Sequence, residues 1–135
     1  MPRQLRTRAV SEKQVLAYIK KAEEYLAAAR SELEAGRTIA ATSLAIHAAI
    51  NASDAVTGLR LGRRAAGEDH DQVVILLREA GKDGSEVAKN LARLLPLKSK
   101  AEYEPDEIPK SEAVRAVERA SRCVAVAQRI ANAQR

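Results

Sequence analysis

Arg64 and His70, with five residues between them, are the first pair of side chains in the sequence that could do chemistry together. Cleavage of RNA without a metal needs a base for the 2′-hydroxyl proton, an acid for the leaving oxygen and a cation for the charged phosphorane. An imidazole can act as acid and base, and a guanidinium can hold phosphate through paired hydrogen bonds. His70 and Arg64 are therefore candidate catalytic residues. A second interpretation stays open, in which His70 only helps to cap a helix and Arg63 and Arg64 are solvated.

The sequence around His70 predicts a position that suits a base. Asp69 is an N-cap residue type, and the apolar spacing after it predicts a helix over about residues 70–80. The helix dipole disfavours a protonated imidazole in the first turn, and the unpaired N–H groups there can bind a phosphate. Arg60 and Arg63 come shortly before in the chain, and we expect them to bind phosphate as well.

A polar stripe on an otherwise apolar helix is the second candidate site. A helix is predicted over residues 38–61, and aliphatic side chains cover most of its circumference. The polar side chains that project from it in nearly one direction are Ser43, His47, Asn51 and Asp54. They can form a hydrogen-bonded file, a polar groove where two copies meet, or a buried network that sets helix register. One imidazole and one carboxylate are too few ligands for a metal, so we expect no metal and no cofactor.

These candidate residues must be positioned by helices. We predict an all-α, up-and-down bundle of about five helices, with residues 11–135 as one domain and residues 1–10 as a flexible basic arm. A capping box formed by Ser11 and Gln14 is predicted to start the first helix, and Gly36 to end it. The predicted helices span residues 11–35, 38–61, 70–80, 85–95 and, capped by Ser111, 111 to nearly the end, with a turn at 81–84 and a loop at 96–110.

Composition narrows the class of protein further. The 135-residue chain carries a net charge of +5, one cysteine (Cys123) and three tyrosines, with no Phe or Trp. A single cysteine excludes an intramolecular disulfide, and the positive charge permits an acidic partner such as RNA. Three tyrosines are few platforms for stacking nucleobases. We find no apolar run of membrane-spanning length and no signal peptide, so we expect a cytoplasmic protein without a membrane partner. The apolar circumference of residues 38–61 predicts a homodimer.

Four short segments carry a likeness to a known family. They are Tyr25-Leu26-Ala27-Ala28-Ala29, the small-residue run Ala45 to Ala55, Gly67-Glu68-Asp69-His70 before Val74-Ile75-Leu76-Leu77, and Lys100-Ala101-Glu102-Tyr103. Through these segments, the chain from about residue 25 to residue 127 resembles the HEPN superfamily. Its members are small four- or five-helix domains named for higher eukaryotes and prokaryotes nucleotide-binding.

The resemblance implies a set of functions as well as a fold. Many members form dimers and act as metal-independent ribonucleases of toxin–antitoxin or phage-defence systems through an Arg-x(4–6)-His motif. Arg64 and His70 match that spacing, as do Arg63 and His70 at its upper limit, although Ala65 stands where a polar residue often follows the arginine. Other members are non-catalytic modules that dimerise and bind a partner such as a nucleotidyltransferase. Three functions stay open: a ribonuclease with an antitoxin, a partner-binding module, and a nucleic-acid binder that does not cleave.

Overall fold

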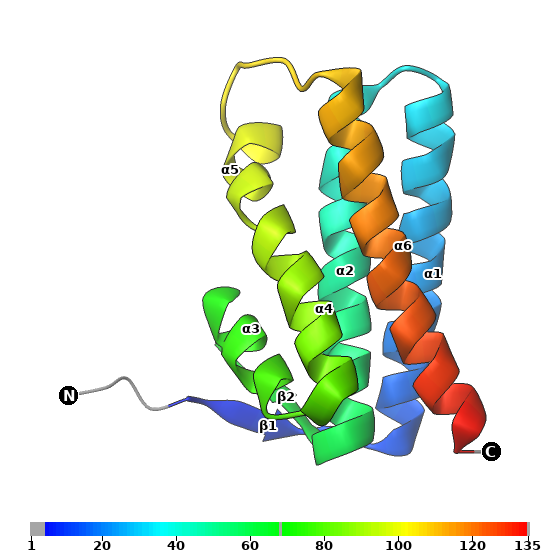
Figure 1. Ribbon diagram of the computed structural model, residues 1–135, viewed down its shortest axis with the longest axis vertical. Helices are drawn as coiled ribbons and strands as arrows, with labels where there is room; N and C mark the ends of the chain where they lie inside the picture. The colour runs from blue at the N-terminus through cyan, green and yellow to red at the C-terminus, as the bar shows by residue number, and fades with distance from the viewer. Residues whose placement is uncertain (1–4, 68, 135) are drawn as a thin grey trace.

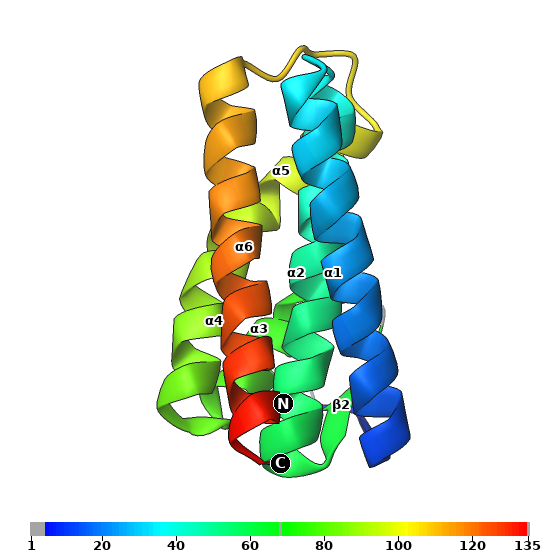
Figure 2. The ribbon, with the colours of Figure 1, turned by 90° about the vertical axis from the view of Figure 1, so that its right-hand side faces the viewer.

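The computed structural model describes residues 5–67 and 69–134, and in them the chain forms six helices and two short strands (Figure 1). The elements in chain order are β1 (Thr7–Ala9), α1 (Glu12–Glu34), α2 (Thr38–Leu61), β2 (Arg63–Ala65), α3 (Asp71–Arg78), α4 (Gly81–Leu94), α5 (Pro96–Glu102) and α6 (Lys110–Ala133). The long helices α1, α2 and α6 lie side by side, and α4 packs against α2 and α6 (Figures 1 and 2). The predicted all-α fold is confirmed, with one helix more than the expected number of about five.

The first helix has the ends that the sequence predicts. The Ser11 hydroxyl accepts a hydrogen bond from the Gln14 backbone N–H (3.1 Å), and the Gln14 side-chain oxygen accepts one from the Ser11 N–H (2.9 Å). This capping box satisfies two donors that the first helical turn leaves unpaired. Gly36, at φ 81°, follows the helix in the left-handed region that glycine adopts without strain.

Helix α2 forms the centre of the bundle and has the bounds that were predicted for it. Its alanines without any exposed surface are Ala41, Ala45, Ala48, Ala49, Ala52 and Ala55. Small side chains at these positions let the neighbouring helices approach closely. By length and composition α2 is apolar enough to cross a membrane, contrary to the expectation from sequence, but 56% of its most apolar window is buried inside the bundle. A helix that is apolar on most sides is also what the core of a bundle requires.

Part of the segment predicted to be a flexible arm is ordered as a strand. Thr7–Ala9 form β1, which pairs antiparallel with Arg63–Ala65 of β2 so that Arg8 lies opposite Arg64. Further bonds flank the strands, from the Ala66 N–H to the Arg6 carbonyl (2.9 Å) and from the Val10 N–H to the Gly62 carbonyl (3.0 Å). The prediction overlooked that the residues after α2 run extended and offer the arm a backbone partner. Residues 1–4 of the predicted arm lie outside the described residues.

The corner between α3 and α4 corrects the prediction of a turn at residues 81–84. Helix α4 begins at Gly81 rather than Ser85. Gly84 is buried, and a Cβ atom there would lie 2.0 Å from the Leu77 carbonyl oxygen of α3. Glycine at this position therefore serves the close approach of two helices and not a turn.

Prolines stand at the starts of two helices, one in a segment predicted to be loop and one predicted to be capped by Ser111. Residues 96–102 form α5 instead of loop, with Pro96 in its first turn, where a missing N–H costs no hydrogen bond. Pro109 is the N-cap of α6, and its carbonyl accepts a hydrogen bond from the Ala113 N–H (3.1 Å). Ser111 therefore lies inside the helix and does not cap it.

Candidate functional site

His70 stands at the N-cap position of α3 and is half-buried. The cap bond comes from its neighbour, because the Asp69 carboxylate accepts a hydrogen bond from the Asp71 N–H (2.9 Å). Burial lowers the pKa of His70, and the positive charge of Lys98 lowers it further, against an opposing effect of Asp69. The interpretation of His70 as the capping side chain is therefore wrong, and its imidazole is kept in the neutral form that a base needs.

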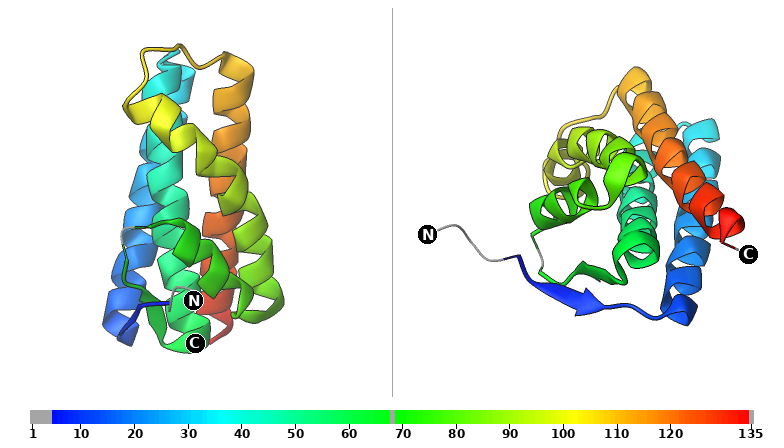
Figure 3. Two further views of the ribbon diagram at one scale, coloured as in Figure 1. Left: turned by 90° about the vertical axis from the view of Figure 1, so that its left-hand side faces the viewer. Right: turned by 60° about the horizontal axis from the view of Figure 1, so that its bottom comes forward.

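His47 on α2 lies within electrostatic reach of His70. Its ring stacks on Tyr25 of α1, with centroids 5.4 Å apart and planes at 29°. Its Nε2 atom is 3.5 Å from a carboxylate oxygen of Glu102, whose other oxygen is 3.2 Å from Lys98 Nζ. We call His47, His70, Lys98 and Glu102 the histidine cluster. The cluster joins α2, the start of α3, and α5, which lie together on one side of the molecule (left panel of Figure 3).

Arg64 of β2 lies beside α2, nearer to the C-terminal end of that helix than His47. Its guanidinium donates a hydrogen bond to the Ala65 carbonyl (3.0 Å) and lies 6.0 Å from the centre of the Tyr18 ring. Its charge also acts on Asp54 of α2, where it partly offsets the effect of burial. Burial raises the pKa of Asp54 to about 7, and among the described residues its buried Oδ1 atom has no hydrogen-bond partner.

The polar stripe on α2 includes both His47, in the histidine cluster, and Asp54, beside Arg64. Asn51 donates a hydrogen bond to the His47 carbonyl (2.8 Å) between them, so its amide serves the helix itself. Because each residue adds 1.5 Å to a helix, the His47 and Asp54 positions are roughly 10 Å apart along the axis. His70 therefore acts near His47 in the stripe, and Arg64 acts near Asp54. Within residues 5–67 and 69–134, no hydrogen bond or ion pair joins Arg64 to His70 directly.

The other two arginines predicted to bind phosphate have carboxylate partners away from the stripe. Arg60 is paired with Asp83 of α4 (2.6 Å), which also pairs with Arg129 of α6 (2.8 Å). Arg63 lies 4.0 Å from Glu79. The structure therefore does not gather Arg60, Arg63 and Arg64 into one phosphate-binding cluster, because the end of α2 directs Arg60 towards α4.

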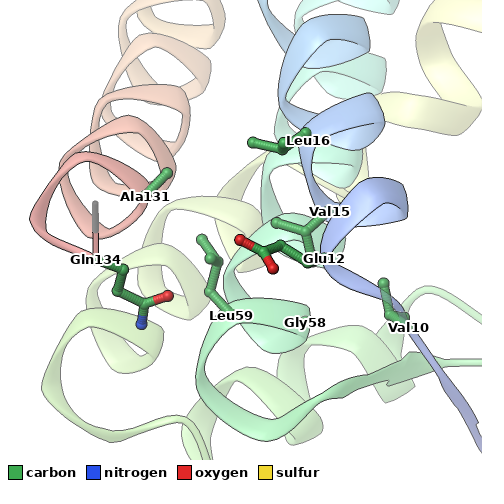
Figure 4. Close-up of a pocket in the computed structure, with 8 residues that line it drawn as sticks. All are labelled: Val10, Glu12, Val15, Leu16, Gly58, Leu59, Ala131 and Gln134. Atoms are coloured by element: carbon green, nitrogen blue, oxygen red, sulfur yellow. The ribbon is translucent and has the colours of Figure 1, made fainter.

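One hollow borders the histidine cluster, and another lies away from it. An open groove of about 800 Å³ runs between the start of α2 and the segment that follows α5, and both Ser43 and Glu102 line it. A smaller hollow of about 360 Å³ lies where the first turns of α1 face the ends of α2 and α6 (Figure 4). Among the described residues that line this smaller hollow, Glu12 is the one ionisable side chain, and none is a predicted site residue.

Lys98 and Glu102 are the site residues that the sequence analysis missed. Both belong to α5, which was predicted to be loop, and they stand four residues apart on that helix. A proline followed by residues with helical spacing was the available signal. The described residues hold no group of three or more His, Cys, Asp and Glu side chains that could bind a metal ion. The arrangement instead offers two imidazoles, a carboxylate and an ammonium group for acid–base chemistry.

Comparison with known proteins gives one match. The family model described as HEPN domain matches residues 15–134. No curated protein matches the chain. Because the family match covers most of the chain, it shows the family to which the chain belongs.

Proposed function

We propose that this chain, which belongs to the HEPN family, is a metal-independent ribonuclease that cleaves single-stranded RNA. The observation that carries the proposal is the histidine cluster, in which half-buried His70 stands at the N-cap of α3 near the charges of Lys98 and Glu102, and Glu102 lies 3.5 Å from the second imidazole, His47. Acid–base cleavage of RNA needs one group to accept a proton and another to donate one, and two imidazoles supply both roles. Arg64, beside Asp54 in the same polar stripe, supplies a cation for the phosphate.

The chemistry follows from these positions. Neutral His70 accepts the proton of the 2′-hydroxyl, and the 2′-oxygen then attacks phosphorus. The bond from phosphorus to the 5′-oxygen breaks, and the leaving oxygen takes a proton from the imidazole of His47, whose Nε2 atom lies 3.5 Å from a Glu102 carboxylate oxygen. Arg64 stabilises the charge that builds on the phosphate oxygens during attack. The products are a 2′,3′-cyclic phosphate and a free 5′-hydroxyl.

The direct test is cleavage of single-stranded RNA in the presence of EDTA, with the cyclic phosphate identified at the new end. His70→Ala is expected to lower kcat/KM about 10²- to 10⁴-fold, which is the usual contribution of a positioned acid–base group. Arg64→Ala is expected to lower it about 10²-fold or more through loss of charge stabilisation. Circular dichroism of both variants should match the wild type, since neither residue belongs to the buried core.

Arg60→Ala is the matched control, because it removes the same charge from a position whose guanidinium is held by Asp83. We expect cleavage by this variant to equal that of the wild type. Activity that survives in His70→Ala, or that EDTA abolishes, would contradict the proposal. Binding of RNA without cleavage would identify a nucleic-acid binder, and co-purification with a protein partner in the absence of both would identify a partner-binding module.

A further inference from the structure

All three aromatic side chains of the chain lie beside a cationic or imidazole group. Tyr18 faces Arg64, with 6.0 Å from the guanidinium carbon to the ring centre, and Tyr25 stacks on His47 at 5.4 Å. Tyr103 has the ammonium of Lys98 5.8 Å from its ring centre. The sequence holds no Phe and no Trp, so its whole aromatic content borders the residues of the candidate site. A ring of this kind can hold a nucleobase where one of its faces is exposed.

Tyr103 differs from the other two tyrosines in its exposure. Tyr18 and Tyr25 are partly buried and pack against the core. Tyr103 is 76% exposed, more than the other exposed large apolar side chains among the described residues, which are Leu16, Ile39 and Ile75. A single exposed ring by itself is ordinary. The Tyr103 ring, however, lies directly after α5 and next to the histidine cluster, where a bound RNA could reach it.

Lys98 links Tyr103 to the proposed catalytic histidine. Its ammonium lies near the Tyr103 ring, is 3.2 Å from the Glu102 carboxylate, and lowers the pKa of His70 through its charge. One cation is thus shared by an aromatic platform and by the residues proposed to transfer protons. Aromatic rings hold bases by stacking and ammonium groups hold phosphates by charge, so the pair fits one nucleotide.

We propose that Tyr103 and Lys98 form a nucleobase subsite, in which an unpaired base next to the scissile phosphate stacks on the Tyr103 ring. The inference rests on the proposed function for its ligand, single-stranded RNA. A base inside a duplex has both faces covered by its neighbours, whereas an unpaired base can turn a face towards an exposed ring. Tyr103 is therefore a specificity-determining residue that selects unpaired nucleotides.

Binding to the non-cleaving His70→Ala protein tests the subsite apart from catalysis. Affinity is measured by fluorescence anisotropy for two labelled oligoribonucleotides of equal length, one of uridines and one of abasic sugars with the same phosphates. Adding Tyr103→Ala is expected to weaken uridine binding about tenfold, within the range measured for loss of one stacked base, and to leave abasic binding unchanged. Tyr103→Phe keeps the ring and is expected to bind uridines as the parent does.

Ile75→Ala is the matched control, because Ile75 is another large exposed apolar side chain (54%) but belongs to α3 and not to the segment after α5. It is expected to bind both oligonucleotides as the parent does. Equal affinity of the parent for the uridine and abasic oligonucleotides would overturn the subsite, as would equal losses on both from Tyr103→Ala. If the uridine-specific loss appears while the wild type fails to cleave RNA, the subsite stands and the proposed ribonuclease function falls. If the wild type cleaves and Tyr103→Ala binds both oligonucleotides normally, the function stands and the subsite falls.

Discussion

The two sides of α2 differ in composition and in role. One side carries alanines such as Ala45 and Ala49, which have no exposed surface and let the other helices approach. The other side carries His47, whose side chain is 42% exposed, and Asp54, which has a buried carboxylate oxygen without a hydrogen-bond partner among the described residues. The alanine side stabilises the bundle through packing, whereas the polar side retains groups that packing alone would not favour.

This contrast shows how a bundle of small residues can hold reactive groups in fixed positions. His47 and Asp54 cannot move relative to each other without deforming a helix whose opposite side is fully packed. An unsatisfied buried carboxyl costs free energy, and the well-packed side of the same helix can offset that cost. Substitutions on the polar side are therefore expected to change pH dependence and activity, and substitutions on the alanine side to change stability.

The largest expected effect is on the pH dependence of stability at Asp54. Its pKa is about 7 in the folded chain and near 4 when unfolded, so the folded state binds more protons between these values. The contribution of Asp54 to the free energy of unfolding is then highest below pH 4. It falls as pH rises to about 7, by as much as about 4 kcal/mol in total. Asp54→Asn is expected to remove this fall and to raise the free energy of unfolding at pH 8, measured by urea denaturation from pH 5 to 8.

Asp106→Asn is the control for that experiment, because Asp106 lies exposed in the segment after α5. Its pH profile of stability should follow the wild type. A wild-type profile without any decline between pH 5 and 7 would show that Asp54 is not held in an unfavourable site, and the contrast between the two sides of α2 would lose its main support.

The alanine side is tested by Ala49→Leu. Ala49 has no exposed surface and belongs to the core cluster, so the larger side chain must push helices apart or strain its own rotamer. Overpacking of this kind is expected to lower the free energy of unfolding by about 1–3 kcal/mol. Under conditions where the variant remains folded, we expect cleavage at the wild-type rate. A loss of activity without a loss of stability would mean that the alanine side also contributes to the site.

A smaller effect, on the pH profile of kcat/KM, is expected from two substitutions on α5 that remove charges of opposite sign. Glu102 raises and Lys98 lowers the pKa of His70 through their charges. The acid limb of the pH profile of kcat/KM reports that pKa if His70 is the base. Glu102→Gln should move the limb to lower pH and Lys98→Met to higher pH, each by less than about one pH unit because solvent screens the charges of partly exposed side chains. Shifts in the same direction for both variants would refute the role of His70 as the base.

The helical core of this fold could be predicted from sequence, and the segments between the helices could not. Apolar spacing gave the bounds of α2, and the Ser11–Gln14 pair gave the start of α1, because both signals are local. The glycines around Gly84 were misinterpreted because their role is a contact with α3 that a local pattern does not contain. The pairing of β1 with β2 joins segments far apart in the chain, and neither strand has the length or alternation that predicts a strand.

The candidate site was predictable in the same partial way. The stripe on α2 was found because its spacing is helical, and His70 was found because of its place before a helix. Lys98 and Glu102 were missed because residues 96–110 were predicted to be loop, so that no helix was expected to bring them to His47 and His70. The partners of Arg60 could not be foreseen, since they depend on how α4 packs against the end of α2.

The strand pair has a practical consequence for work on this protein. Arg64 sits in a connection between helices that is fastened by backbone hydrogen bonds to β1, and a ribbon of only two short strands is easily pulled apart. A fusion ahead of β1 that disturbs this ribbon would displace the Arg64 guanidinium while every helix stays intact. An affinity tag is therefore better placed after α6.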